Sequence, residues 1–266
     1  MKIIVPIKQV PESSNVKMDP VTGTVIRTGI ETVVNPLDLY ALEAALRLKE
    51  QYGGTVTAIS MGPPNAIRVL KEAVAMGCDD AILVSDKKFG GSDTLATSYI
   101  LSQAILKIGD FDIIITGERA TDGDTAQVGP GIAAWLDIPL ATYAAKICEI
   151  KENKMITERL VEEGYQKISL PLPCLISVVK EIATPRLPTL DGKIRSMEMN
   201  YPVFSTENLS LNHDLIGLKG SPTKVDKITV PKILRKSNVI TVTDDISLNE
   251  AVDAILDLLE KKGALS

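Results

Sequence analysis

The chain of 266 residues has little histidine and little cysteine: one histidine, His213, and three cysteines. A catalytic triad or a histidine metal site needs imidazole beside other functional groups, so a lone histidine nearly excludes both. No C-x-x-C occurs, and an odd number of cysteines does not suit a disulfide framework or a zinc site. We expect Cys78, Cys148 and Cys174 to be small buried apolar residues. Any redox chemistry must then be carried by a bound cofactor.

Excess positive charge and long apolar runs are also missing. Acidic residues number 34 against 29 Lys and Arg, a net charge of −5, which argues against a nucleic-acid-binding surface. No segment is long and apolar enough to span a bilayer. Residues 1–5 lead directly into a predicted strand, without the apolar run and cleavage site of a signal peptide. We therefore expect a cytoplasmic protein with no membrane span.

What the first half contains is a regular alternation of strand and helix patterns. The predicted strands are residues 2–8, 56–60, 81–84 and 111–115, and the predicted helices are residues 37–52, 63–76, 92–108 and 132–136. This alternation predicts an α/β fold, a Rossmann-like sheet with a parallel core and helices on both faces. Pro6 within the first strand implies an edge, a bulge or a place where a ligand meets the backbone. Residues 16–27 are predicted to form a hairpin.

The pattern changes after about Ile138. Residues 141–150, 155–161 and 174–179 alternate like strands, which predicts antiparallel additions to the same sheet, with a turn at 151–154. From about Thr184 regularity falls, and so long an irregular run is unusual in an isolated domain. We therefore divide the chain into an α/β domain, residues 1–183, and an extended C-terminal arm, residues 184–266.

The arm is predicted to end in an amphipathic helix over residues 247–262. Its apolar stripe needs a surface to cover, either on a partner subunit or, as the alternative, on its own domain. The stripe consists of Leu248, Ala251, Val252, Ile255, Leu258 and Leu259.

The stretch from Thr116 to Gly131 is rich in glycine and joins a predicted strand to a predicted helix. Exposed N–H groups at a helix N-terminus form a ready site for a nucleotide pyrophosphate. Gly123 is expected to take positive φ and let the backbone approach the ligand, so a β-branched residue there should weaken binding. The alternative is a long surface loop with acidic helix caps.

Several details of this loop stay open. Asp124 and Gln127 have the spacing of a capping box, but Pro130 requires that the helix be distorted or begin nearer Val128. Asp122 and Asp124 could hold a cation, although helix capping and solvation explain them more simply. The pattern G-x-G-x-x-A at residues 129–134 should follow its strand directly to be a dinucleotide fingerprint, and it does not.

Residues 90–93, Gly-Gly-Ser-Asp, are similar to a phosphate loop of ATP-using ligases. The simpler interpretation is that Ser92 or Asp93 caps the following helix. The chain contains neither G-x-x-x-x-G-K-S/T nor G-x-S-x-G, which excludes a P-loop NTPase and a hydrolase of the nucleophile-elbow type.

Short motifs spread along nearly the whole chain form a specific set when taken together. They are Ile4-Val5-Pro6-Ile7-Lys8-Gln9-Val10, Val34-Asn35-Pro36, Ile59-Ser60-Met61-Gly62-Pro63, Ala73-Val74-Ala75-Met76-Gly77, the loop from Gly117 to Pro130, Arg159-Leu160-Val161-Glu162-Glu163-Gly164-Tyr165 and Leu170-Pro171-Leu172-Pro173. The set resembles the β subunit of electron transfer flavoprotein. Glu163 departs from the glycine or aspartate frequent in that family, which we interpret as surface variation. The resemblance makes residues 1–183 a nucleotide-binding domain and residues 184–266 a partner-recognition loop and arm.

The resemblance implies one of two nucleotides. In the housekeeping kind of the family the β subunit holds AMP structurally, and in the electron-bifurcating kind it binds a second FAD. Residues 122–130 and 34–38 resemble the bifurcating version, since the housekeeping kind tends to carry Cys-Asn-Gln-Thr where residues 125–128 stand. FAD is therefore the expected cofactor and AMP the alternative. The implied nucleotide-contacting residues are Pro6, Asn35, Pro36, Leu37, Asp38, Met61, Gly117, Glu118, Arg119, Ala120, Thr121, Asp122, Gly123, Asp124, Thr125, Ala126, Gln127, Val128, Gly129 and Pro130.

The implied function is electron transfer in a heterodimer with an α subunit. NADH would be the donor, and ferredoxin and a flavin-dependent dehydrogenase, the latter reached through the α-subunit FAD, would be the acceptors. Residues 185–190 resemble the family's recognition loop, which places Leu190 where an exposed leucine inserts into the dehydrogenase. The alternatives are an incidental apolar residue at position 190 and, for the whole chain, an AMP-binding subunit without a redox centre. An ATP-dependent ligase on a similar fold would need a catalytic motif that is absent here.

Overall fold

The computed structural model describes residues 1–12, 31–224 and 239–264. The chain divides into two units, Met1–Asp226 and Lys227–Ser266, and each is considered by itself. The predicted hairpin at residues 16–27 lies outside the described residues.

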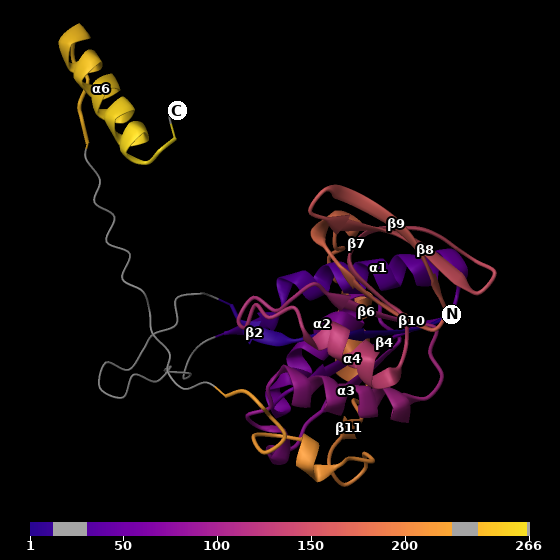
Figure 1. Cartoon of the computed structure of the whole chain (residues 1–266). Coiled ribbons are helices and arrows are strands. Elements are labelled where there is room, and N and C mark those ends of the chain that lie inside the picture. The colour runs from indigo at the N-terminus through magenta and orange to yellow at the C-terminus, as the bar shows by residue number, and fades with distance from the viewer. Residues whose placement is uncertain (13–30, 225–238, 265–266) are drawn as a thin grey trace. The chain divides into compact units, whose positions relative to one another are not determined.

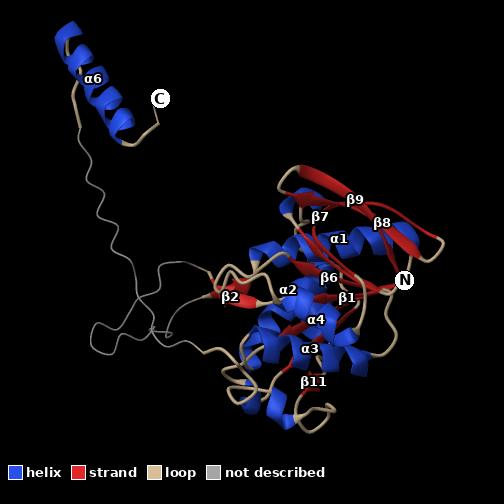
Figure 2. Cartoon of the chain, viewed as in Figure 1, coloured by secondary structure: helices blue, strands red, loops and turns tan. Residues whose placement is uncertain are grey.

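The first unit is built on a nine-stranded sheet (Figures 1 and 2) with the order β11-β5-β4-β1-β6-β10-β7-β8-β9. Neighbouring strands from β11 to β7 run parallel, and the pairs β7–β8 and β8–β9 are antiparallel. The strands are β1 (Lys2–Pro6), β4 (Thr55–Met61), β5 (Asp80–Val84), β6 (Ile113–Gly117), β7 (Leu140–Lys151), β8 (Lys154–Val161), β9 (Gly164–Pro171), β10 (Cys174–Val178) and β11 (Val203–Phe204). The predicted α/β class, a largely parallel sheet with added antiparallel strands, is confirmed.

One strand was predicted in the wrong orientation. Residues 174–178 form β10, which lies between β6 and β7 and runs parallel to both. All five residues of β10 are buried, as is typical of a strand covered on both faces of a parallel sheet. The antiparallel addition is instead made by β7, β8 and β9.

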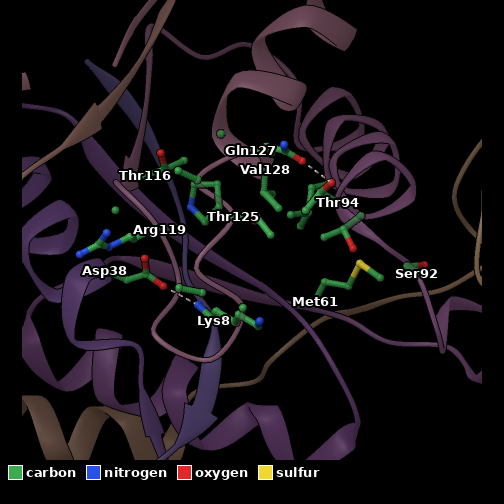
Figure 3. Close-up of a pocket in the computed structure, with 18 of the residues that line it drawn as sticks. Lys8, Asp38, Met61, Ser92, Thr94, Thr116, Arg119, Thr125, Gln127 and Val128 are labelled. Carbon is green, nitrogen blue, oxygen red and sulfur yellow. Dashed lines mark hydrogen bonds between the residues drawn. The ribbon is translucent and has the colours of Figure 1, made fainter. Parts of the chain in front are cut away.

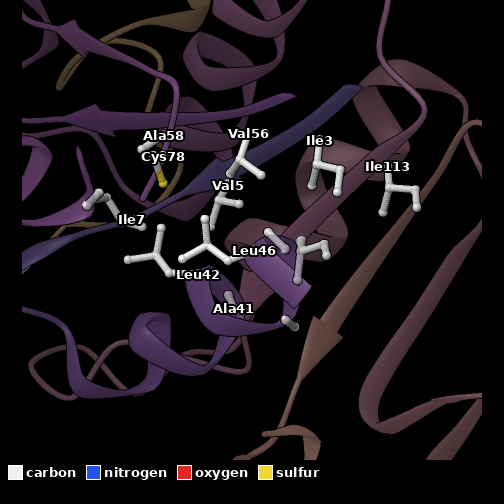
Figure 4. Close-up of a cluster of buried hydrophobic side chains, with 14 of the residues drawn as sticks. Ile3, Val5, Ile7, Ala41, Leu42, Leu46, Val56, Ala58, Cys78 and Ile113 are labelled. Carbon is white, nitrogen blue, oxygen red and sulfur yellow. The ribbon is translucent and has the colours of Figure 1, made fainter. Parts of the chain in front are cut away.

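Helices cover both faces of the sheet because the side chains of its central strand point alternately to opposite sides. Ile3 and Val5 of β1 pack in one core cluster with Leu42 and Leu46 of α1 (Figure 4). Buried residues of α2 belong to the same cluster. Ile4 packs in a second cluster with α3 and α4. The helices are α1 (Pro36–Tyr52), α2 (Ile67–Met76), α3 (Thr94–Ile108), α4 (Val128–Leu136) and α5 (Leu190–Glu198), with short 3-10 turns η1 (Pro64–Ala66), η2 (Lys87–Phe89), η3 (Lys180–Ile182) and η4 (His213–Leu215).

A small antiparallel sheet lies beside the end of β1. It pairs β2 (Gln9–Pro11) with β3 (Thr32–Val34). The chain enters α1 directly from β3, and the Asn35 N–H donates to the Lys8 carbonyl at 2.8 Å. The start of α1 is thereby fixed against the carboxyl end of β1.

Residues 184–224 are more regular than the sequence suggested. They include α5, which packs on α2, and β11, which extends the sheet beyond β5. Both elements are too short for apolar periodicity to reveal them. The division between the two compact units falls between Asp226 and Lys227.

The second unit contains α6 (Asp245–Lys261), which begins with a capping box between Asp244 and Ser247. None of its residues is buried, so no described residue of this unit covers the predicted apolar stripe. No helix in the described ranges is long and apolar enough to cross a membrane.

Candidate functional site

A cavity of about 540 Å³ opens at the carboxyl ends of β1, β4 and β6 (Figure 3). Pro6, Met61 and Gly117, the last residues of these three strands, all line it. The chain runs from β1 outward on one side to β4 and β5 and then returns to β6 on the other side. Cavities at such a switch point are the usual ligand sites of open α/β sheets, and this volume is in the range of roughly 300–1,000 Å³ typical of small-molecule pockets.

The N-terminus of α4 supplies unpaired hydrogen-bond donors to this cavity. Its N-cap, Gln127, makes no side-chain cap hydrogen bond. The N–H groups of Val128 and Gly129, both at the cavity, come before any intrahelical partner can exist. Pro130 is the third residue of the helix and has no N–H, so it causes no break there. This explains how the helix begins at Val128.

The neighbouring helix at the cavity, α3, has a side-chain cap at its start. The Asp93 carboxylate accepts from the N–H groups of Leu95 and Ala96, each at 3.0 Å. It also accepts from the N–H and hydroxyl of Thr223 at 3.0 and 2.8 Å. The interpretation of residues 90–93 as a helix cap is confirmed, with Asp93 as the cap. Among the described residues, the Asp93 carboxylate thus already occupies two N–H groups at the start of α3, whereas no side chain caps the start of α4.

Thr116 adds a further donor beside α4. It is 6% exposed, it lines the cavity, and its hydroxyl has no hydrogen-bond partner among the described residues. A Cβ on Gly129 would lie 2.7 Å from this oxygen, so only glycine lets the helix start come this close. Buried polar groups without partners are rare in folded proteins. Thr116 therefore places an unsatisfied hydroxyl on the same wall of the cavity as the first N–H groups of α4.

The side chain of Asn35 binds the backbone of the glycine-rich loop at two points. It is completely buried; its side-chain amide donates to the Arg119 carbonyl at 2.9 Å and its side-chain oxygen accepts from the Thr121 N–H at 3.1 Å. Asn35 does not line the cavity. Its part in the site is to fix the loop that does.

Asp38 holds the ends of two strands together at the cavity wall. Its carboxylate accepts from the Lys8 N–H at 2.7 Å, and Gly117 at the end of β6 lies so close that a Cβ there would overlap this carboxylate. Burial raises the pKa of Asp38 to about 7, although the hydrogen bonds from Lys8 and Asn35 oppose the shift. This carboxyl is thus the one described group at the cavity whose pKa is shifted close to neutral pH.

The acidic residues of the loop are held in ion pairs. Asp122 pairs with the Lys8 ammonium at 2.6 Å, and Asp124 pairs with Arg119 at 3.1 Å. Each carboxylate thus has a protein cation, which removes the reason to place a metal ion there. The capping box predicted for Asp124 and Gln127 is wrong, because Gln127 is itself the N-cap and accepts from the Thr94 hydroxyl at 3.0 Å.

The backbone strain of the loop lies next to Gly123 and not on it. Positive φ occurs at Asp124 (53°) and Ala126 (55°), whereas Gly123 is outside that region and a Cβ there would meet nothing within 4 Å. The strain argument for Gly123 is therefore wrong. Non-glycine residues in this conformation cluster at ligand sites, and Ala126 lines the cavity.

The structure brings most of the predicted site residues to one cavity. Those that line it are Pro6, Asp38, Met61, Gly117, Glu118, Arg119, Ala120, Gly123, Thr125, Ala126, Gln127, Val128 and Gly129. Those that do not are Asn35, Pro36, Leu37, Thr121, Asp122, Asp124 and Pro130. Leu190 lies apart, at the first position of α5, and is 75% exposed.

Sequence reasoning missed part of the wall. Lys8, Ser92, Thr94, Thr97 and Thr116 also line the cavity. The Gly-Gly-Ser-Asp stretch at 90–93 was the available signal for the α3 side, since it stands where a strand meets a helix, as the main loop does.

A family model of the electron transfer flavoprotein domain matches residues 22–200 of the chain. The chain is 46% identical over 269 residues to the electron transfer flavoprotein subunit beta of Megasphaera elsdenii, covering 98% of this chain and 97% of the relative. It is 43% identical over 263 residues to the protein of the same name from Thermoanaerobacterium thermosaccharolyticum, covering 98% and 99%. A third relative, 41% identical with the same coverage, is the Caffeyl-CoA reductase-Etf complex subunit CarD of Acetobacterium woodii.

The three relatives each match 98% of the chain, and the family model includes the loop after β6 and the start of α1. The chain belongs to the electron transfer flavoprotein family, as the β subunit of its heterodimer.

Proposed function

We propose that the cavity binds FAD and that the subunit works in electron bifurcation. The observation that carries the nucleotide site is that the Thr116 hydroxyl, without a partner among the described residues, and the first N–H groups of α4 lie on one wall of the cavity. Three neutral donors at a helix N-terminus suit the pyrophosphate of a dinucleotide. The preference for FAD over AMP rests on residues 122–130 and 34–38, whose sequence resembles the bifurcating kind.

When bound, FAD would supply the redox chemistry, accepting a hydride from NADH and releasing one electron to ferredoxin and one through the α-subunit FAD to a flavin-dependent dehydrogenase. The chain's own residues bind and orient. Val128, Gly129 and Thr116 would hold the phosphates, and Asn35 keeps the loop in place around them. Met61 would pack against an uncharged part of the ligand, because it lines the same cavity at the end of β4.

Docking to the dehydrogenase is proposed at α5. Leu190 stands at its first turn with its side chain largely in solvent. A large apolar side chain held in solvent is a natural anchor for a partner pocket, where such a residue can contribute about 2 kcal/mol or more.

A flavin count on the heterodimer tests the cofactor proposal. Two flavins per heterodimer, with FAD as the only nucleotide released on denaturation, are expected. One flavin and one AMP would overturn the FAD assignment in favour of the structural-nucleotide alternative. The visible spectrum of the purified pair gives the flavin content, and chromatography of the extract identifies the nucleotides.

The variant Thr116→Val tests the position of the site. It removes an unpaired hydroxyl, so the folded subunit should lose little stability, while occupancy of the β-subunit nucleotide should fall and the α-subunit flavin should stay. Ser60→Ala is the matched control, since the Ser60 hydroxyl is also buried without a partner but lies outside the cavity lining. Full nucleotide occupancy in Thr116→Val would remove Thr116 from the site.

A further inference from the structure

Exposed leucines precede and begin α5. Leu187 is 86% and Leu190 is 75% exposed, and Ile194 and Met197 continue the apolar face along the helix. Residues 183–189, which lead into α5, have no regular secondary structure. A segment of this kind needs side-chain contacts to hold one conformation, because fixing each backbone residue costs roughly 1–2 kcal/mol.

A buried carboxylate supplies the first such contact. Glu43 on α1 has a side chain that is 4% exposed. Arg186 donates to it three times, from its N–H at 3.1 Å, its Nε at 2.8 Å and its Nη2 at 3.2 Å. Arg47 donates a fourth bond at 2.8 Å. Burial alone would raise the pKa of Glu43, but the bonds from Arg186 and Arg47 lower it below its ordinary value, so the carboxylate stays charged.

Glu50 binds the same guanidinium from the solvent side. It accepts from Arg186 Nη1 at 2.5 Å and Nη2 at 3.1 Å, but its own side chain is 59% exposed. Exposed ion pairs contribute little because water screens them. Glu43 and Glu50 are thus a matched pair of acceptors on one arginine, one buried and one not.

The other end of the segment is fixed to α2. Thr189 caps α5 by accepting from the Gly192 N–H at 3.0 Å, and the Arg195 guanidinium donates to the carbonyls of Val74 and Cys78. Gly192 lies so close to the Ala75 carbonyl that a Cβ there would overlap it. Leu187 and Leu190 therefore lie between two attachments. One is Arg186, which is bound to Glu43 of α1, and the other is the first part of α5, which is bound to α2.

We infer that Glu43 and Arg186 are positioning residues for partner recognition, which hold Leu187 and Leu190 in a docking-ready arrangement. The inference rests on the proposed docking of a flavin-dependent dehydrogenase at α5. The pair acts before binding: it removes the conformational cost that a loose segment would bear on association. Glu43 and Arg186 themselves need not touch the partner.

Trypsin gives a direct readout of the pair in the intact heterodimer. Cleavage after Arg186 requires this side chain to leave Glu43 and enter the protease. In Glu43→Gln, cleavage of the 186–187 bond should be about tenfold faster or more, the factor that corresponds to ~1.4 kcal/mol lost from a charge-assisted bond. Glu50→Gln should cleave within about threefold of wild type. Equal cleavage of Glu43→Gln and wild type would overturn the inference.

Electron transfer supplies the functional readout, using a flavin-dependent dehydrogenase shown beforehand to accept electrons from the wild-type heterodimer. Glu43→Gln should raise the KM for this dehydrogenase several-fold and leave kcat and flavin reduction by NADH unchanged, whereas Glu50→Gln should match wild type. The double variant Glu43→Gln/Arg186→Gln, which leaves no unpaired buried charge, should show the same rise in KM and protects the test against misfolding.

Leu190→Ala distinguishes the docking proposal at α5 from the positioning role of Glu43 and Arg186. If Leu190→Ala weakens transfer and both Glu43 variants do not, docking at α5 stands and the positioning role falls. If Leu190→Ala and Leu187→Ala both transfer at the wild-type rate, the docking proposal itself is wrong and the positioning role falls with it. A raised KM in Leu187→Ala, Leu190→Ala and both Glu43 variants, together with faster trypsin cleavage in Glu43→Gln, supports both the docking proposal and the positioning role.

Discussion

The side chain of Asn35, just before α1, is hydrogen-bonded at 2.9 Å to the carbonyl of Arg119, in the loop after β6. The two residues are 84 positions apart in the chain. With the second bond, from the Thr121 N–H, one buried amide fixes two points of the loop. The loop's conformation is therefore set from outside its own sequence.

Asn35→Ala should loosen this loop and weaken nucleotide binding by roughly 1–3 kcal/mol, because it leaves buried backbone groups unpaired. Trypsin cleavage after Arg119 and titration with FAD would measure the two effects. Asn208→Ala is the control, since the Asn208 side chain also bonds two backbone groups, those of Ser205 and Val203, but within a local turn. The proposed role of Asn35 would be contradicted if both variants behaved alike.

Two glycines at the cavity should differ in how much stability the protein loses when each is replaced by alanine. A Cβ on Gly117 would overlap Asp38 and lie 2.9 Å from the Leu37 carbonyl, so Gly117→Ala should lose roughly 1–3 kcal/mol of unfolding free energy. Gly123→Ala meets open space and should stay within about 0.5 kcal/mol of wild type. Denaturant titrations check both.

Gly123→Val then tests ligand binding separately from stability, because a Cβ at this position meets no other atom of the protein within 4 Å. If FAD passes over Gly123, calorimetric titration of flavin-depleted protein should show weaker binding at unchanged stability. An unchanged affinity would remove Gly123 from the binding site.

Asp38 should give the subunit a pH-dependent stability. Its pKa is about 7 in the folded protein against 3.8 for an ordinary aspartate, so between these values the folded state holds a proton that the unfolded state has lost. The contribution of Asp38 to the free energy of unfolding is thus largest below about pH 4 and declines as the pH rises towards 7, by about 1.4 kcal/mol per pH unit at most.

The comparison with Asp38→Asn tests this, because all other titrating groups are shared. Relative to the variant, the wild type should lose stability steadily from about pH 4 to pH 7 and change little above that range. Thermal unfolding of both proteins across this range gives the difference. A difference that stays constant with pH would show that Asp38 does not titrate in this window.

Removal of α6, with the chain ending at Asp244, should leave the first unit folded, since that unit ends near Asp226. The uncovered apolar stripe of α6 predicts that affinity for the α subunit falls. Size-exclusion chromatography of the co-expressed subunits measures this. Stoichiometric co-elution would show that α6 is not the main contact. Failure of the shortened chain to fold would show that the helix packs on its own subunit.

Local patterns were enough to predict much of the sheet and the helices around it. The apolar runs of β1, β4, β5 and β6 and the spacing in α1 and α3 are strong signals because the strands are mostly buried and the helices are long. The orientation of β10 was not readable, since its partners β6 and β7 are chosen by tertiary packing. β11, only two residues long, carries no periodicity.

The part of the site that one continuous segment forms could be predicted. The part in which segments distant in sequence come together could not. The loop from Thr116 to Gly131 was recognisable by its glycines alone. The roles of Asn35 and Lys8 depend on contacts with Arg119 and Asp122, far away in sequence. The strain at Ala126 rather than at Gly123 likewise follows from how the loop is held, which composition does not reveal.

Asp93 binds a residue near the end of the first unit to the start of α3. One carboxylate both caps the start of α3 and accepts two hydrogen bonds from Thr223. A change at Asp93 would therefore act at once on the start of α3 and on the attachment of Thr223, although the two residues are 130 positions apart in the chain.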